Sequence, residues 1–221
     1  MVKPPKKRKK KMRVSTPGKR FKIQGRNPVF MSGVKVVKGK EGAMSFGTGP
    51  CFTLVFQLRG KLSRERGPRG VRRRWGEPTS VVWHVTSSHA SEGEGRLDGR
   101  EEVAKKLRMG ELPGYETEGF HPKTVTDGIL DYLHGNSGVG AHIVVTAIPG
   151  RVTLEERGGA EAMGEMMELL RRYKEDGRIH NLRTRGLSKS KGSPSTHVDS
   201  RGRINREALG PRPKVKKDGQ A

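Results

Sequence analysis

The sequence predicts an α+β domain: a small antiparallel or mixed sheet with about three helices, flanked by disordered basic arms. Three segments alternate apolar and polar residues, three others repeat apolar residues at helical spacing, and basic residues crowd towards both ends. Only 31% of the 221 residues are hydrophobic and 5% aromatic, so the whole chain cannot bury one core. We therefore expect an arm at 1–27, a folded domain at 28–182 and a flexible basic tail at 183–221. A mostly-β sandwich is the alternative fold.

The strand pattern is clearest at 52–58, where every second residue is apolar and its neighbours include Thr53 and Gln57. Residues 80–86 and 141–148 follow the same pattern. A turn at 149–150 predicts a further strand at 152–154. Residues 29–37 form another candidate, interrupted at Ser32 and Gly33.

Helical spacing occurs in three places. Asp98 and Glu101 have the spacing of a capping box ahead of an apolar run that stops at Gly110. A second helix is predicted at 124–133, just after Pro122. The third, at 160–174, repeats large side chains at helical intervals, namely Met163, Met166, Met167, Leu170 and Tyr173.

Positive charge dominates the chain, with 46 Lys and Arg against 23 Asp and Glu and a formal net charge of +23. Residues 1–91 hold 23 basic and 3 acidic side chains, residues 92–176 hold 11 and 17, and residues 177–221 hold 12 and 3. Like charges in the first block repel one another unless a polyanion neutralises them.

The N-terminal arm is the first candidate site for binding nucleic acid. A Lys or Arg that neutralises a phosphate releases a condensed counterion, which favours binding without reading the sequence. The candidate contacts are Lys6, Lys7, Arg8, Lys9, Lys10, Lys11, Arg13, Lys19 and Arg20. The run from Lys6 to Lys11 also has the composition of a nuclear import signal, and a solubilising tail is a further interpretation.

A second basic cluster lies between two predicted strands, so we expect a basic loop at 60–76. Its candidate nucleic-acid contacts are Arg64, Arg66, Arg69, Arg72, Arg73, Arg74 and Trp75. The indole ring of Trp75 offers a surface on which an unpaired base can stack, which indicates single-stranded RNA. Alternatively, Trp75 belongs to the edge of the core and the arginines are solvated.

Signals for catalysis, metals and membranes are weak. The glycine-rich segment 135–140 precedes a strand, whereas phosphate loops follow a strand and open a helix. Cys51 is the single cysteine, and the seven histidines lack zinc-protease spacing. We therefore expect no enzyme, no cofactor and no metal. No apolar run reaches the roughly 18 residues of a membrane span, and none follows the basic start as in a signal peptide, so we expect neither membrane insertion nor secretion.

One short segment resembles a known RNA-binding family. The strand 81–85, the glycine-containing turn 92–95 and the helical residues 103–106 are similar to the closing strand and helix of a double-stranded-RNA-binding domain. In that family a basic cluster opens the helix, whereas Asp98, Glu101 and Glu102 stand here. Its binding residues are therefore not transferred to this chain.

The arrangement of a basic arm before a strand-bearing domain resembles small viral coat and nucleocapsid proteins, whose β-rich shell would match the sandwich alternative. The resemblance implies a non-enzymatic RNA-binding structural protein of the virion or host cytoplasm, with the nucleus or nucleolus as further locations. Its acidic middle would dock on other copies, giving a homo-oligomer. A ribosomal protein, or a viral accessory protein for RNA movement or silencing suppression, remains open.

Overall fold

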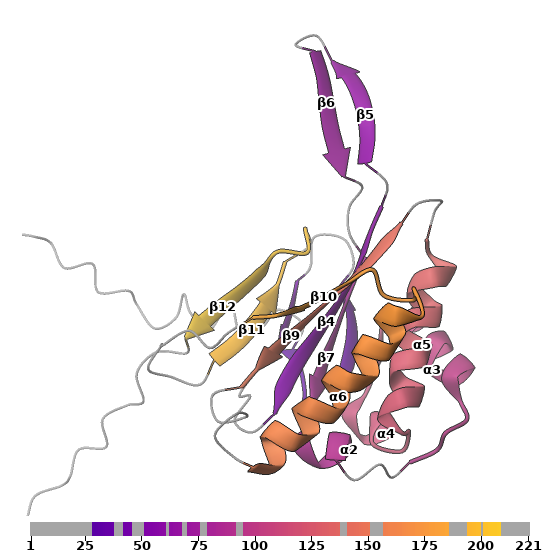
Figure 1. Ribbon diagram of the computed structural model, residues 1–221, viewed down its shortest axis with the longest axis vertical. Helices are drawn as coiled ribbons and strands as arrows, with labels where there is room; N and C mark the ends of the chain where they lie inside the picture. Colours follow the sequence, from indigo (N-terminus) through magenta and orange to yellow (C-terminus); the bar gives the residue numbers. More distant parts are fainter. Residues whose placement is uncertain are drawn as a thin grey trace, which may run out of the picture.

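The computed structural model describes residues 28–37, 42–45, 51–60, 62–67, 70–75, 79–91, 95–137, 141–150, 157–185, 194–199 and 201–208. Within these residues a six-stranded sheet lies between a layer of helices and a smaller four-stranded sheet (Figure 1). The predicted α+β class is confirmed. The predicted arm at 1–27 and the predicted strand at 152–154 lie outside the described residues.

The central sheet has the strand order β10-β9-β4-β7-β2-β8. Its strands are β10 (Asn181–Thr184), β9 (His142–Pro149), β4 (Phe52–Arg59), β7 (Thr79–Val85), β2 (Val34–Val37) and β8 (Glu111–Leu112). All neighbours are antiparallel except β10 and β9, which are parallel. The strands predicted at 52–58, 80–86 and 141–148 are confirmed as β4, β7 and β9.

Five helices are described: α2 (Ser87–Ser91), α3 (Arg100–Met109), α4 (Gly114–Thr117), α5 (Pro122–Gly135) and α6 (Arg157–Glu175). The three predicted helices are α3, α5 and α6. The predicted capping box at Asp98 is wrong, because Gly99 is the N-cap of α3 and no side chain caps the helix. Gly99 adopts a φ of 97°, and a Cβ there would lie 2.7 Å from the ring of Phe120.

The main core lies between the helices and one face of the central sheet. Phe52, Leu54 and Phe56 of β4 point into it together with Trp83 of β7, and all four are fully buried. From the helices, buried apolar residues of α3, α5 and α6 complete the cluster, including Leu107, Ile129 and Leu170. The alternation read from the sequence thus corresponds to the helix-covered face.

The other face of β4 is covered by the second sheet, whose order is β1-β3-β11-β12. Its strands are β1 (Pro28–Val29), β3 (Ala43–Ser45), β11 (Pro194–Val198) and β12 (Ile204–Ala208). Val55 and Val82 of the central sheet pack with Val29 and Val198 of the second. Polar contacts also join the two layers, since Gln57 Nε2 donates to the carbonyl oxygen of Gly202 at 2.6 Å.

The sequence interpretation of 183–221 as a flexible tail therefore has to be corrected, because 194–198 and 204–208 are strands. The aliphatic residues of this segment are too few to offset the entropy cost of ordering it by themselves. They need not form a core of their own: Val198 adds to a face that Val55 and Val82 already supply, and β11 pairs with β3.

His84 is buried between the two sheets, on the same face of β7 as Val82. Among the described residues neither ring nitrogen finds a partner in good hydrogen-bonding geometry. Burial lowers the pKa of His84 to about 4, an effect that the backbone of Val29 opposes only in part. The folded protein therefore holds this imidazole neutral at a pH where the unfolded chain protonates it.

We expect the free energy of unfolding to fall as the pH drops from 6.5 towards 4, because the unfolded state then binds the extra proton. His84 contributes about 3 kcal/mol to this loss. Urea unfolding between pH 7.5 and 4.5 measures it. The substitution His84→Leu should flatten the profile, whereas His134→Gln, on an exposed helix end, should leave it unchanged. Identical profiles for His84→Leu and the unsubstituted protein would contradict the assignment.

Candidate nucleic-acid interface

A two-stranded antiparallel hairpin, made by β5 (Leu62–Gly67) and β6 (Gly70–Trp75), projects from one end of the central sheet (Figure 1). This corrects the expectation of a basic loop at 60–76. Our strand prediction relied on apolar alternation, which is missing here because five arginines occupy the two strands. The ribbon connects β4 to β7, the two strands at the centre of the fold.

The register of the hairpin places like charges opposite each other. Arg64 pairs with Arg73, while Glu65, the single acidic residue of the two strands, pairs with Arg72. Directly opposed residues of an antiparallel pair lie on the same face, and like charges there destabilise the pair. A lone two-stranded ribbon is marginal in any case. A bound polyanion would remove this repulsion and stabilise the ribbon.

The residues predicted to bind nucleic acid divide into two groups. Six of them lie on the hairpin strands: Arg64, Arg66, Arg72, Arg73, Arg74 and Trp75. Trp75 pairs with Leu62 at the base of the ribbon. The others lie outside the described residues: Lys6, Lys7, Arg8, Lys9, Lys10, Lys11, Arg13, Lys19, Arg20 and Arg69. The structure therefore brings together one of the two predicted clusters.

Histidines that the sequence reading set aside gather where the hairpin leaves the sheet. Arg59 and His142 form the last β4–β9 pair before the ribbon, and His180 precedes β10 at the same end. The rings of His142 and His180 are in edge-to-face contact, with centroids 4.7 Å apart. His142 and His180 lie 38 positions apart in sequence and are brought together by the pairing of β9 with β10, so their spacing in sequence does not reveal the contact.

Basic residues also follow the β10 edge of the sheet. Residues 171–185 hold six Lys and Arg against Glu175 and Asp176. A hollow of about 520 Å³ lies between α6 and β10, and its lining consists of Met167, Arg171, Lys174, Glu175, Leu182 and Thr184. Arg178 is engaged in the protein itself, since its guanidinium lies 2.5 Å from Asp127 and 4.7 Å above the ring of Tyr173.

The opposite edge of the sheet, around β8, α3 and α4, holds three ion pairs. Lys35 lies 2.9 Å from Glu111, Lys106 lies 2.8 Å from Glu116, and Arg96 lies 3.0 Å from Glu102. Such exposed pairs add little stability, but each cancels a positive charge. The excess positive charge of the described residues is therefore carried chiefly by the hairpin and the β10 edge.

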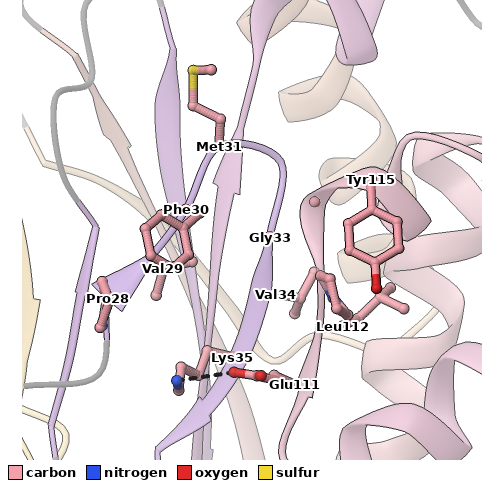
Figure 2. Close-up of a pocket in the computed structure, with 12 residues that line it drawn as sticks. Pro28, Val29, Phe30, Met31, Gly33, Val34, Lys35, Glu111, Leu112 and Tyr115 are labelled. Carbon is pink, nitrogen blue, oxygen red and sulfur yellow. Dashed lines mark ion pairs between the residues drawn. The ribbon is translucent and has the colours of Figure 1, made fainter.

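An apolar groove of about 620 Å³ lies beside β8. Phe30 and Tyr115 stand on opposite sides of it, with Val34 and Leu112 between them and the Lys35–Glu111 ion pair at one end (Figure 2). The side chains of Phe30, Met31 and Tyr115 are 73%, 68% and 78% exposed. Large apolar side chains gathered in this way are a feature of interaction surfaces.

The turn that carries Phe30 and Met31 is held firmly. Ser32 is buried at a φ of 58°; its hydroxyl lies 3.0 Å from that of Thr86 and donates to Glu118 at 2.7 Å. Its carbonyl accepts from the indole N–H of Trp83 at 3.2 Å. Phe30 and Met31 are therefore exposed by a fixed backbone.

The described residues show neither a metal-binding cluster nor a membrane-spanning helix. They hold no group of three or more His, Cys, Asp or Glu placed to bind a metal ion. No helix in this part of the chain has the length and apolar character needed to cross a membrane.

Comparison with known proteins gives no family for this chain: no protein-family model matches it, and no curated protein matches it in sequence.

Proposed function

We propose that this protein is a non-enzymatic RNA-binding structural protein that packages single-stranded RNA through its basic arms and hairpin and self-associates through its folded domain. The observation that carries the proposal is the hairpin register, which opposes Arg64 to Arg73 with one acidic residue in the two strands. The opposed arginines of such a ribbon repel each other when nothing is bound, and phosphate groups would neutralise them.

The proposed partner is single-stranded RNA because of the form of the basic segments. A lysine-rich arm neutralises phosphates as separate point charges, whereas arginines on a paired backbone offer a planar fork to a phosphate. The arm and the hairpin together suit a flexible single strand, whose phosphates can contact each of them in turn. As a viral coat or nucleocapsid protein, the chain would work in the virion and host cytoplasm.

Self-association is supported by the apolar groove beside β8, for which we propose a second copy of the chain as the occupant. The strand β8 forms the edge of the central sheet but has only two residues, so backbone pairing would add little and the exposed aromatic side chains would supply most of the contact. Phe30 and Tyr115 flank this edge on fixed elements. Large RNA-dependent homo-oligomers distinguish this function from that of a ribosomal protein, which should remain monomeric on one RNA site.

Double-stranded DNA is a second candidate ligand, favoured by the shape of the hairpin. A two-stranded ribbon fits the major groove of B-DNA, which is about 12 Å wide. Competition between a single-stranded oligoribonucleotide and a DNA duplex of equal length decides between them, and binding that grows with RNA duplex length would favour the accessory-protein alternative instead.

We expect Arg73→Glu to lower RNA affinity at least about tenfold at moderate ionic strength, because it reverses one charge of the hairpin. The substitution creates an opposite-charge pair with Arg64, so the fold should not lose stability. Fluorescence anisotropy with a labelled oligoribonucleotide measures the affinity. The matched control is Lys105→Glu on α3, an exposed site with the same change of charge. Equal effects of the two variants would remove the hairpin from the interface.

Deletion of residues 1–13 removes eight Lys and Arg. If about six of them contact single-stranded RNA, the slope of log affinity against log salt should shrink by about 4. Titrations at several salt concentrations measure the slope. An unchanged slope would mean that the arm does not contact RNA.

The double substitution Phe30→Ser and Tyr115→Ser should weaken self-association at least about tenfold, because large aromatic side chains dominate the energy of protein interfaces. Sedimentation velocity with and without RNA measures it. Leu97→Ser is the control, since Leu97 is 71% exposed but does not line the groove. Unchanged oligomers in the double variant would place the contact elsewhere.

A further inference from the structure

Two histidine rings are in contact at the root of the hairpin, and a third histidine, His134, lies near enough to act electrostatically on one of them. His142 opens β9, His180 immediately precedes β10, and His134 lies in the last turn of α5. All three side chains are exposed. The planes of His142 and His180 are inclined at 82° with ring centroids 4.7 Å apart, so protonating both rings places two like charges in contact.

His180 is held in a fixed orientation by the edge of β9. Its Nδ1 accepts a hydrogen bond from the backbone N–H of Ile143 at 3.2 Å, and its own backbone N–H donates to the carbonyl of Ile143 at 2.9 Å. An imidazole that accepts at Nδ1 carries its proton on Nε2 when it is neutral. His180 therefore presents an N–H donor from a ring that the backbone has already oriented.

Among the described residues, the charges that act on His180 are those of other histidines. Burial lowers the pKa of His180 first, and His142 and then His134 lower it further. On the sheet, Arg59 is paired in register with His142, and Arg183 lies on β10. On α5, Asp131 is engaged by Arg100 at 3.4 Å and by Arg178 at 3.6 Å. On α6 and the turn after it, Lys174, Glu175 and Asp176 are the charged residues nearest in sequence.

We infer that His134, His142 and His180 form a phosphate-binding site at the root of the hairpin, which takes a phosphodiester group of a nucleic acid and binds it more tightly as the pH falls. The inference rests on the proposed function, because it adds a site to the same interface. His180 donates through Nε2 as a neutral ring, since protonating Nδ1 would break its bond with the Ile143 N–H. His142 and His134 therefore supply the titrating charge.

Proton uptake and phosphate binding reinforce each other at such a site. A phosphate beside His142 and His134 favours the charged form of each ring, so the complex takes up protons as it forms. Any group whose pKa rises on binding makes the affinity increase as the pH drops through that range. The basic arms do not contribute to this effect, because Lys and Arg stay charged from pH 5.5 to pH 8.

The position of the site suits a continuous path for one strand. Arg59 and His142 form the last sheet pair before the hairpin. In the other direction, Leu182 and Thr184 of β10 follow His180 and line the hollow that also holds Arg171 and Lys174. A phosphodiester chain leaving the ribbon would cross the histidines before reaching this hollow.

The test measures binding of a fluorescein-labelled oligouridylate to the full chain at pH 5.5 and pH 8.0, with ionic strength held constant. The unsubstituted protein should bind at least about tenfold more tightly at pH 5.5. The triple variant His134→Gln, His142→Gln and His180→Gln should keep less than about a threefold difference. His121→Asn is the control, because His121 caps α5 through its ring and Asn keeps a capping acceptor.

A second readout follows the proton itself. When the oligouridylate is added at constant pH, the ring NMR signals of His142 and His134 should move towards those of protonated imidazole, while the hydrogen bond to Nδ1 of His180 persists. An equal pH dependence in the triple variant would overturn the inference and leave the proposed function standing, provided that Arg73→Glu still weakens binding. Loss of binding on adding EDTA would also overturn it, since a bridging metal would then be responsible. No binding by the unsubstituted protein at either pH would overturn both.

Discussion

The burial of both faces of β4 is the constraint on which the rest of this structure depends. Phe52, Leu54 and Phe56 face the helices, while Val55 packs against the second sheet and Thr53 donates to Ser45 at 2.9 Å. Burying an unpaired charge in either layer would be expensive. A chain with 46 Lys and Arg must therefore place them at the ends and edges of the central sheet or outside it.

The charges are sorted between the two edges of the sheet. Around β8 the lysines and arginines meet glutamates, as in the Lys106–Glu116 pair, so that edge offers little to a polyanion. At the hairpin and along β10, basic residues far outnumber acidic ones, and Arg64 faces Arg73 in register. We propose that a bound phosphate chain relieves the repulsion between these basic residues. The apolar groove lies at the paired edge, so RNA binding and self-association would use different sides of one domain.

The sequence predicts the parts of the fold that carry a strong hydrophobic period. β4, β7 and β9 alternate visibly, and α6 repeats methionines on one face, so these elements and the α+β class could be foreseen. The hairpin could not, because its strands carry arginines where alternation would place apolar residues. β11 and β12 could not be predicted either, because their stability depends on pairing with strands from elsewhere in the chain: β11 pairs with β3, and β12 pairs with β11. For the same reason the Arg cluster was visible as a candidate site, whereas the meeting of His142 and His180 depends on strand pairing.

Hydrogen exchange of the full chain with and without a saturating single-stranded oligoribonucleotide tests the central claim most directly. Amide exchange reports which backbone segments are stabilised by the ligand. The account predicts slower exchange in the hairpin, at 62–67 and 70–75, and along 178–185, with no change at 100–109 in α3. Protection confined to α3, or a hairpin whose exchange is unaffected by bound RNA, would contradict it.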